Sequence, residues 1–196
     1  MVMKKIVFFV LISIVSLTVN AQVKFGPVVN LGLGFYSNRI DDLTLKSSLN
    51  PSFGFAVEKY IDYWFSLRTS ALYSFRNLTT EQKSDGLTDH LNGQFVDLFV
   101  DGIFSDFDDS NKISPYGTTG LGVGINIITN GQKKYLKNDE YESALPFFTI
   151  GAGIRYKISF LSALDISLNY NRCLRQPINY LDARLNQMSL KVITFF

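Results

Sequence analysis

The sequence offers few residues for catalysis. His90 is the single histidine, and it follows Asp89 with Ser84 a few positions upstream. These residue types take part in acid–base and nucleophilic chemistry. The spacing places no second catalytic group within reach of the imidazole, and a histidine in a polar stretch is typically a solvated loop residue. We therefore predict no enzymatic activity.

One acidic stretch has the composition of a calcium-binding loop. It consists of Asp106, Asp108, Asp109, Ser110 and Asn111. The glycine and the terminal glutamate that an EF-hand loop requires are missing. We predict a solvated turn here, with no metal and no cofactor. Cys173 is the single cysteine, so no disulfide can form within the chain.

Charged residues recur at alternate positions within otherwise apolar segments, and we predict that they share one enclosed face. Unpaired charges in a narrow interior are costly, so these side chains are expected to pair in networks. Lys157 and Asp165 flank a short turn and are expected to meet. The predicted network comprises Lys24, Glu58, Arg68, Arg76, Asp97, Asp101, Arg155, Lys157, Asp165 and Lys191.

The elements that carry these charges have a period of two, which is typical of strands with one apolar and one polar face. Segment 94–104 is the least regular, because Phe95 and Phe99 share a face with Asp97 and Asp101. The pattern predicts eight strands, at residues 23–36, 52–58, 65–76, 94–104, 120–127, 148–158, 164–171 and 187–196.

The connections alternate in length. Short turns are expected near residues 61–62 and 161–162, and a middling one at 105–114. Long polar loops are predicted at residues 37–50, 77–92, 129–144 and 172–183. Short turns on one side and long loops on the other are typical of an up-and-down outer-membrane barrel. An even strand number places both termini on the short-turn side, the periplasm.

The first 21 residues have the features of a secretory signal peptide. Lys4 and Lys5 precede a short apolar run, and small residues end at Ala21. We predict cleavage between Ala21 and Gln22, and one domain over residues 22–196. A transmembrane helix is the alternative, but a span needs about 20 apolar residues and this run is shorter.

The charge balance excludes nucleic acid as a partner. The chain has 19 basic and 17 acidic residues, and removing Lys4 and Lys5 leaves 17 of each. No basic surplus remains to neutralise phosphates. By contrast, 46% of the residues are hydrophobic and 14% aromatic. An exported chain with this composition and no apolar helix fits a barrel, which satisfies its backbone hydrogen bonds in lipid.

A period of two alone does not show whether the apolar face of the barrel points inward or outward. A soluble lipocalin-like barrel, with its apolar face inward around a ligand, is the alternative. The glycine, serine and alanine of the opposite face favour a narrow interior, and aromatic residues at strand ends favour lipid girdles. The aromatic residues predicted for the girdles are Tyr36, Tyr60, Tyr63, Trp64, Tyr73, Phe75, Phe104, Phe107, Phe147, Tyr156, Phe160, Tyr170 and Phe196.

Several stretches resemble the PorT-like outer-membrane β-barrel family, within the small OmpX-like eight-stranded barrels. They are FGPVVNLGLG at 25–34, FVDLFV at 95–100 and PYGTTGLGVG at 115–124. Asp97 and Asp101 depart from the proline and lysine that family members often carry in this strand. The resemblance implies an integral outer-membrane protein. It also implies that the barrel insertion machinery recognises the C-terminal Phe196. It does not imply the secretion role of the founding member.

The predicted function is structural or interactive rather than enzymatic. Eight-stranded barrels are narrow enough for side chains to fill, so we expect a plugged lumen. Binding is expected at the long loops, with outer-membrane lipid, lipopolysaccharide or a surface protein as partners. The candidate contacts in loop 129–144 are Lys133, Lys134, Tyr135, Lys137 and Tyr141. The alternative is an accessory component of a secretion or assembly system that binds a periplasmic protein.

Overall fold

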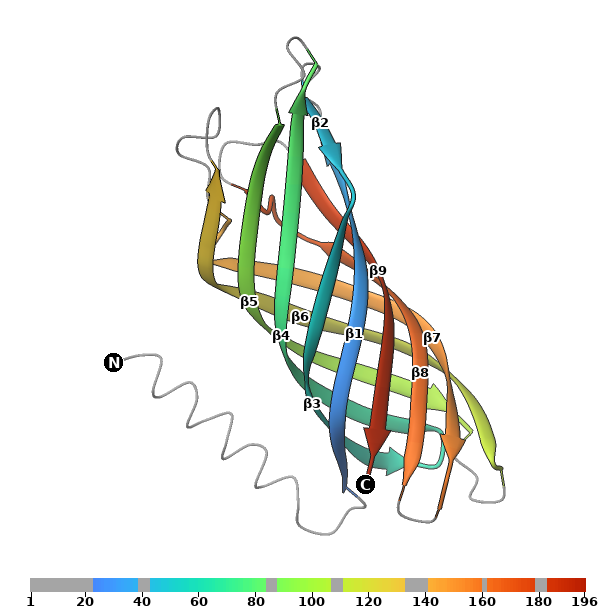
Figure 1. Ribbon diagram of the computed structural model, residues 1–196. Coiled ribbons are helices and arrows are strands. Elements are labelled where there is room, and N and C mark those ends of the chain that lie inside the picture. The colour runs from blue at the N-terminus through green and yellow to red at the C-terminus, as the bar shows by residue number, and fades with distance from the viewer. Residues whose placement is uncertain are drawn as a thin grey trace.

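The computed structural model describes residues 23–38, 43–83, 88–106, 111–132, 141–159, 162–178 and 183–196. None of these residues forms a helix long and apolar enough to cross a membrane. They form nine strands (Figure 1). The predicted signal peptide and the cleavage residues Ala21 and Gln22 lie outside this part of the chain. The strands are β1 (Val23–Asn38), β2 (Leu43–Lys46), β3 (Ser48–Asp62), β4 (Phe65–Gln82), β5 (Thr88–Ser105), β6 (Ile113–Gln132), β7 (Ala144–Lys157), β8 (Ala163–Cys173) and β9 (Ala183–Phe195).

Eight of the strands form a closed antiparallel barrel. Each pairs with its neighbours in the sequence, and β1 pairs with β9 to close the ring. The backbone N–H of Phe196 donates to the carbonyl of Phe25 at 2.9 Å, so the pairing reaches the last residue. The end of β9 and the beginning of β1 lie at the same end of the barrel (Figure 1). The prediction of an eight-stranded up-and-down barrel is confirmed.

Strand β2 is the additional element. Only Ser47 separates it from β3, and its residues pair with the far end of β4, from Leu43↔Gln82 to Lys46↔Thr79. The two strands therefore act as one long, interrupted strand. A salt bridge between Lys46 and Glu81, at 2.7 Å, joins the same pair of strands.

The predicted long loops are wrong in extent, because the strands continue far into them. Strand β4 ends at Gln82 and β5 begins at Thr88, so most of residues 77–92 is paired sheet. Residues 43–46 and 48–50 likewise belong to β2 and β3, and β6 continues to Gln132. The short connection predicted near residues 61–62 is confirmed, since only Tyr63 and Trp64 join β3 and β4. After β7, the Ile158 N–H donates to the Ser162 carbonyl at 3.0 Å, while residues 160 and 161 lie outside the described part of the chain.

The apolar face of the barrel points outward. Phe25 is 60% exposed, Phe55 69%, Leu121 62% and Leu168 54%, while the alternate positions are buried. The soluble, lipocalin-like alternative is therefore wrong, because it requires these residues to line an internal cavity. A continuous belt of exposed aliphatic and aromatic side chains is the surface that a bilayer covers.

Two groups of aromatic side chains mark the edges of this belt on β4. At the turn end, Phe65 packs against Phe104 with ring centroids 5.2 Å apart. At the other edge, Tyr73 packs against Phe75, also at 5.2 Å. Phe65 and Phe75 are ten residues apart, roughly 34 Å of extended strand. A strand tilt of about 40° reduces this to about 25 Å, the height of a barrel's apolar band. We call this the lipid band.

Three of the predicted girdle aromatics face the interior instead. Tyr60 and Phe147 contact buried arginines, and the Tyr36 hydroxyl lies 3.4 Å from that of Tyr141. All three occupy inward positions in the strand alternation. The girdle prediction was wrong for these three residues because it relied on their position at strand ends. Position along a strand does not determine which face a side chain takes.

The barrel continues beyond the lipid band, and there its polarity is reversed. We call this part the extension; it includes residues 77–82 of β4, 88–93 of β5 and strand β2. Its outward residues are polar, and its inward Leu78 and Leu91 are each 1% exposed. The inward Thr80 and Asp89 follow toward the rim. A polar outer wall with an apolar interior is the pattern of a barrel in water.

Candidate functional site

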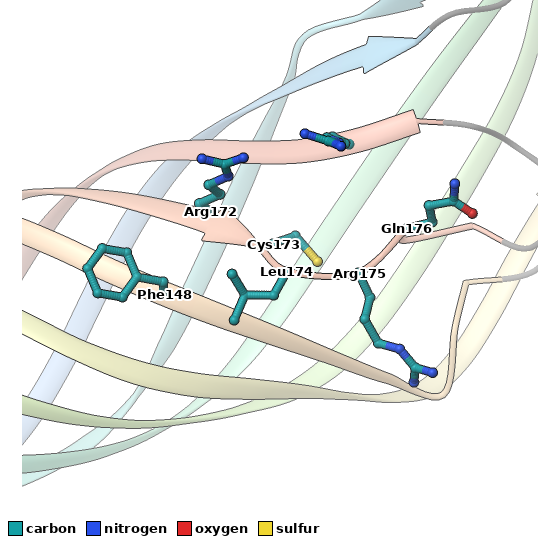
Figure 2. Close-up of a pocket in the computed structure, with 7 residues that line it drawn as sticks. Phe148, Arg172, Cys173, Leu174, Arg175 and Gln176 are labelled. Carbon is teal, nitrogen blue, oxygen red and sulfur yellow. The ribbon is translucent and has the colours of Figure 1, made fainter.

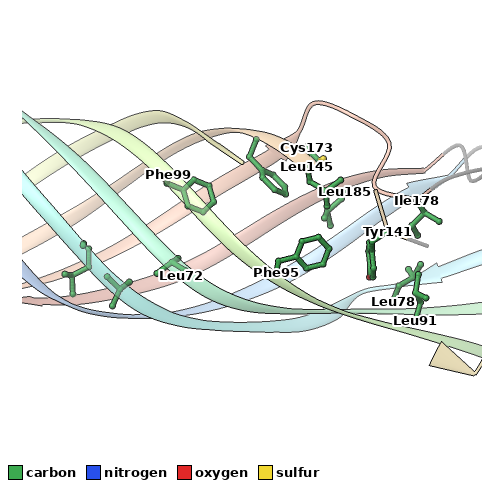
Figure 3. Close-up of a cluster of buried hydrophobic side chains, with 14 of the residues drawn as sticks. Leu72, Leu78, Leu91, Phe95, Phe99, Tyr141, Leu145, Cys173, Ile178 and Leu185 are labelled. Carbon is green, nitrogen blue, oxygen red and sulfur yellow. The ribbon is translucent and has the colours of Figure 1, made fainter. Parts of the chain in front are cut away.

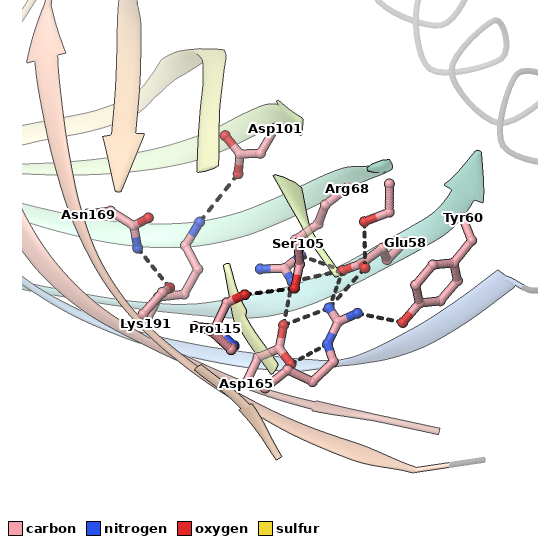
Figure 4. Close-up of polar contacts among 12 residues, drawn as sticks. Glu58, Tyr60, Arg68, Asp101, Ser105, Pro115, Asp165, Asn169 and Lys191 are labelled. Carbon is pink, nitrogen blue, oxygen red and sulfur yellow. Dashed lines mark hydrogen bonds and ion pairs between the residues drawn. The ribbon is translucent and has the colours of Figure 1, made fainter. Parts of the chain in front are cut away.

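The lumen contains four buried charges near the turn end (Figure 4). Glu58 and Arg68 are cross-strand partners on β3 and β4, and Arg155 and Asp165 are partners on β7 and β8. The two pairs meet across the lumen: Arg155 Nη2 lies 2.8 Å from both carboxylate oxygens of Glu58, and Arg68 pairs with Asp165. Each side chain is at most 2% exposed. Two guanidinium groups therefore neutralise two carboxylates.

Aromatic and hydroxyl groups enclose this four-charge cluster. The ring of Phe195 lies 5.3 Å from the Arg68 guanidinium and 5.5 Å from that of Arg155. Arg155 donates a hydrogen bond to the Tyr60 hydroxyl, and the Ser66 hydroxyl donates to Glu58 at 2.7 Å. Such partners satisfy the remaining donors and acceptors, which a buried ion pair needs to be tolerated.

Two further ion pairs follow along the lumen. Lys191 Nζ lies 3.6 Å from Asp101, and Arg76 Nη2 lies 2.6 Å from Asp97. The Arg76 guanidinium also lies between two rings, 4.1 Å from that of Phe95 and 4.8 Å from that of Phe147. Phe95 and Phe99, which made segment 94–104 look irregular, are inward residues that pack on these cations.

Glycines on β6 make room for these groups. A methyl group at Gly124 would lie 2.5 Å from Asp97 Oδ1 and 2.7 Å from Arg76, and one at Gly122 would lie 2.2 Å from the Phe99 ring. The glycine-rich face of β6 is therefore the wall against which the larger side chains of β5 pack. This supports the interpretation that small residues line a narrow, filled interior.

Apolar side chains occupy the lumen at the extended end (Figure 3). Tyr141, before β7, and Ile178, after β8, form an isolated bridge, and both are buried. Tyr141 packs edge-on against Phe95 at 5.3 Å. Burial, with the Tyr36 phenol as a second cause, raises the pKa of the Tyr141 phenol well above its ordinary value. The cluster also includes Leu78, Leu91, Leu145, Cys173 and Leu185.

The predicted charge network divides into these separate groups. The expected meeting of Lys157 with Asp165 is replaced by another pairing, since Lys157 lies opposite Ala163 while Asp165 binds Arg68 and Arg155. The register explains this: Arg155, two residues earlier, is the direct partner of Asp165. Lys24 is only half buried and lies over the Tyr60 ring at 5.3 Å.

Tyr141 corrects the prediction for the candidate loop contacts. We expected it to be exposed, but it is 3% exposed and lies inside the barrel, where it bridges to Ile178 and packs against the ring of Phe95. Lys133, Lys134, Tyr135 and Lys137 lie outside the described residues. Phe196 is 56% exposed on the apolar face, as its position in the alternation predicted.

His90 does not lie in a loop as predicted. It is an outward residue of β5, and its Nδ1 lies 3.1 Å from the hydroxyl of Thr79, its cross-strand partner. Asp106 and Asn111 lie at the two ends of the acidic connection. The intervening Asp108, Asp109 and Ser110 are outside the described part of the chain.

Sequence reasoning missed three features. The aromatic partners Tyr60 and Tyr116 were not recognised as lumen residues, the packing of Phe195 on the arginines was not foreseen, and the apolar cluster of the extension was not recognised. The outward arginines Arg172, Arg175 and Arg184 were assigned to a loop or left unassigned. The outward position of Arg172 could have been predicted, because Arg172 continues the alternation of the outward residues Leu168 and Tyr170 on β8.

An outward apolar belt bounded by aromatic residues, on a closed barrel with a charged and filled interior, defines a membrane-embedded β-barrel. The chain belongs to the outer membrane protein beta-barrel domain family, whose model matches residues 7–193. No curated protein sequence is significantly similar to it.

Solved structures show the same fold at very low sequence identity. The outer membrane protein OprG from Pseudomonas aeruginosa superposes with a TM-score of 0.60 at 7% identity, covering 88% of this chain and 93% of OprG. Neisserial surface protein A superposes with a TM-score of 0.53 at 13% identity, covering 89% of this chain and 97% of that protein. At these identities the similarity concerns the fold alone.

Proposed function

We propose that this protein is a non-enzymatic outer-membrane barrel whose lumen is closed and whose activity is binding at its extended rim. One observation carries the proposal: the interior is occupied along its length, by the four-charge cluster, then two ion pairs, then the apolar cluster. A filled interior of this kind leaves little room for solute passage. The outer surfaces then remain as the places where a partner can bind.

The extension is the proposed binding platform. Its polar outer wall suits water, and its buried core of Leu78, Leu91 and Tyr141 holds it rigid. A rigid scaffold that presents loops is a common arrangement for recognition. We place the extension outside the cell and both termini in the periplasm, after cleavage between Ala21 and Gln22. Residues 133–140, with three lysines and a tyrosine, connect two strands at this rim.

Conductance tests the closed lumen. Purified protein in planar bilayers is expected to give no steady channel of nanosiemens size. Steady conductance by the wild-type barrel would contradict the proposal.

Removal of residues 133–140 tests the rim. A Gly-Ser linker in their place should leave the heat-dependent gel shift of a folded barrel unchanged, because Tyr141 and β6 up to Gln132 remain. Binding of cells to immobilised host or bacterial surface components should fall. Unchanged binding after the replacement would remove these residues from the proposal.

We also propose that the protein belongs to the PorT-like group, because the stretches at 25–34 and 115–124 that carry the resemblance lie within β1 and β6. An accessory role in secretion or assembly is a second candidate function, which the resemblance itself does not imply. The Asp-rich connection at residues 106–112 would then face the periplasm and offer a site for an accessory role. Periplasmic proteins that co-purify with the wild type, and are lost when this connection is replaced by Gly-Ser, would favour that role over rim binding.

A further inference from the structure

A surface groove of about 420 Å³ lies on the outside of the barrel, where β8 leaves the sheet (Figure 2). Figure 2 shows the side chains of Arg172 and Arg175 extending from the chain on either side of Leu174. Arg184, at the beginning of β9, lines the same groove, and Phe148 on β7 provides an apolar wall. Three guanidinium groups and two large apolar side chains therefore share one depression.

The groove lies at the edge of the lipid band. The outward residues of β8 run Ile166, Leu168, Tyr170 and then Arg172. Those of β9 run Leu190, Met188, Asn186 and then Arg184. The change from apolar to polar falls at the same height on both strands, since Tyr170 pairs with Met188 and Arg172 with Asn186. The Tyr170 hydroxyl donates to Asn186 Oδ1 at 3.0 Å, at the height where aromatic residues bridge lipid and water.

Among the described residues, none of the three arginines has an acidic neighbour that neutralises it. Within the described residues, no carboxylate forms an ion pair with Arg172, Arg175 or Arg184, whereas Arg68, Arg76 and Arg155 in the lumen are all paired. All three groove arginines are exposed. A cluster of unpaired guanidinium groups favours a multivalent anion, and phosphate matches their planar fork of donors.

We propose that this groove binds the phosphate group of an outer-leaflet glycolipid, a phosphorylated lipid A. The guanidinium groups donate to the phosphate oxygens at the headgroup level. Phe148, 39% exposed, lies level with Arg172, its cross-strand partner, and Ile150, 51% exposed, lies one outward position closer to the band. These two apolar side chains contact the beginning of the acyl chains. A soluble anion would use the arginines but not these apolar residues, which is why the structure favours a lipid. The inference rests on the outward orientation given under the proposed function.

Native mass spectrometry of the purified full-length barrel tests the inference. The wild type is expected to retain bisphosphoryl lipid A more tightly than monophosphoryl lipid A or phosphatidylglycerol. The triple variant Arg172→Gln, Arg175→Gln and Arg184→Gln is expected to lose about tenfold or more in affinity for bisphosphoryl lipid A, because charge-assisted hydrogen bonds are lost. Lysine at the same three positions should restore part of the binding through charge alone.

The matched control removes three positive charges at the other end of the barrel. Lys59→Gln, Lys112→Gln and Lys157→Gln change the net charge equally and are expected to leave lipid A binding unchanged. The heat-dependent gel shift shows whether each variant folds. The comparison of the three lipids uses the wild type alone, so it tests the proposal even where a variant fails to fold. Residues 133–140 are intact throughout, so failure here is distinct from failure of rim binding.

Three results would overturn the proposal. They are equal affinity of the arginine-to-glutamine triple variant and the wild type, equal retention of phosphatidylglycerol and bisphosphoryl lipid A, and displacement of the lipid by millimolar inorganic phosphate. The last would identify the site as one for a free anion. Lipid A binding that depends on the three arginines and on both lipid phosphates would support it.

Discussion

The lipid band and the extension are built from the same strands, yet their faces are opposite in polarity. In the band, Leu168 and Val100 face outward while Arg68 and Asp101 face the lumen. In the extension, Asn92 faces outward while its neighbour Leu91 is buried. The backbone alternation is continuous between them along β5. The surrounding solvent therefore determines which side chains the strand places outside.

The comparison shows two ways to close one barrel. In the band, lipid covers the outer wall, so the interior can hold polar groups provided that they pair with one another. In the extension, water surrounds the outer wall, so stability requires an apolar interior as in a soluble protein. Arg76 lies at the junction, paired with Asp97 on one side and held between Phe95 and Phe147.

The largest effect is expected from breaking the four-charge cluster. Arg155→Met leaves Glu58 and Asp165 with Arg68 as their remaining guanidinium partner. Removing one member of a buried ion pair costs about 3–5 kcal/mol. Urea titration of the barrel in phosphatidylcholine vesicles measures the free energy of unfolding.

The double variant Arg155→Met with Asp165→Leu is the control for this experiment. It removes one positive and one negative charge, so it is expected to be more stable than Arg155→Met alone. If the single variant were as stable as the wild type, the cluster would contribute nothing to holding β3, β4, β7 and β8 together.

Arginine on the outer wall distinguishes the two regions directly. Leu168→Arg places a charge in lipid and is expected to cost about 2–4 kcal/mol. Asn92→Arg places the same charge on the extension, in water, and is expected to change the free energy of unfolding by about 0.5 kcal/mol or less. Equal costs at the two positions in the same vesicles would mean that both lie in one environment.

Truncation of inward residues makes the complementary comparison. Leu91→Ala in the extension is expected to cost about 2–3 kcal/mol, because it leaves a cavity in an apolar core. Ser70→Ala in the band is expected to be neutral within about 0.5 kcal/mol, because the buried Ser70 hydroxyl has no hydrogen-bond partner among the described residues. Leu91→Met preserves volume and should cost less than Leu91→Ala. The reverse order, with Ser70→Ala the more damaging, would contradict the assignment of the two interiors.

The smallest effect is expected at the hydroxyl of Tyr141. Its contacts are long, 3.4 Å to the Tyr36 hydroxyl and 3.5 Å to the Arg76 carbonyl. Tyr141→Phe is therefore expected to cost about 0.5 kcal/mol or less, whereas Tyr141→Ala removes a buried ring and costs about 3 kcal/mol. Similar unfolding midpoints for both variants would mean that the ring does not close the lumen.

The barrel could be predicted from the sequence because lipid imposes a simple rule on eight segments. Alternation such as that of Phe148, Ile150 and Ile154 identifies the outer face without knowledge of any partner. The extension was not recognised because its outward residues, among them Asn77 and Thr79, resemble loop residues. In water, a polar outward face and a polar loop have similar compositions, so composition alone does not separate them.

Which charged residues pair with each other in the lumen was less predictable than which strand face they occupy. The sequence places Glu58, Arg68, Arg155 and Asp165 inside, but their partners depend on the register of adjacent strands and on contacts across the barrel. Lys157 was assigned to Asp165 because both flank a short turn, whereas the register places Arg155 opposite Asp165. Contacts across the lumen, such as Arg155 with Glu58, join residues far apart in sequence and have no local signature.

Cysteine accessibility in whole cells tests the central claim most directly, which is that the extension projects from the outer membrane into water. In a Cys173→Ser background, single cysteines replace Asn92, Leu168 and Asn111, and intact cells are treated with a membrane-impermeant maleimide. We predict labelling at position 92 in intact cells, no labelling at 168, and labelling at 111 only after the outer membrane is permeabilised. Labelling at 111 in intact cells, or equal labelling at 92 and 168, would contradict the account.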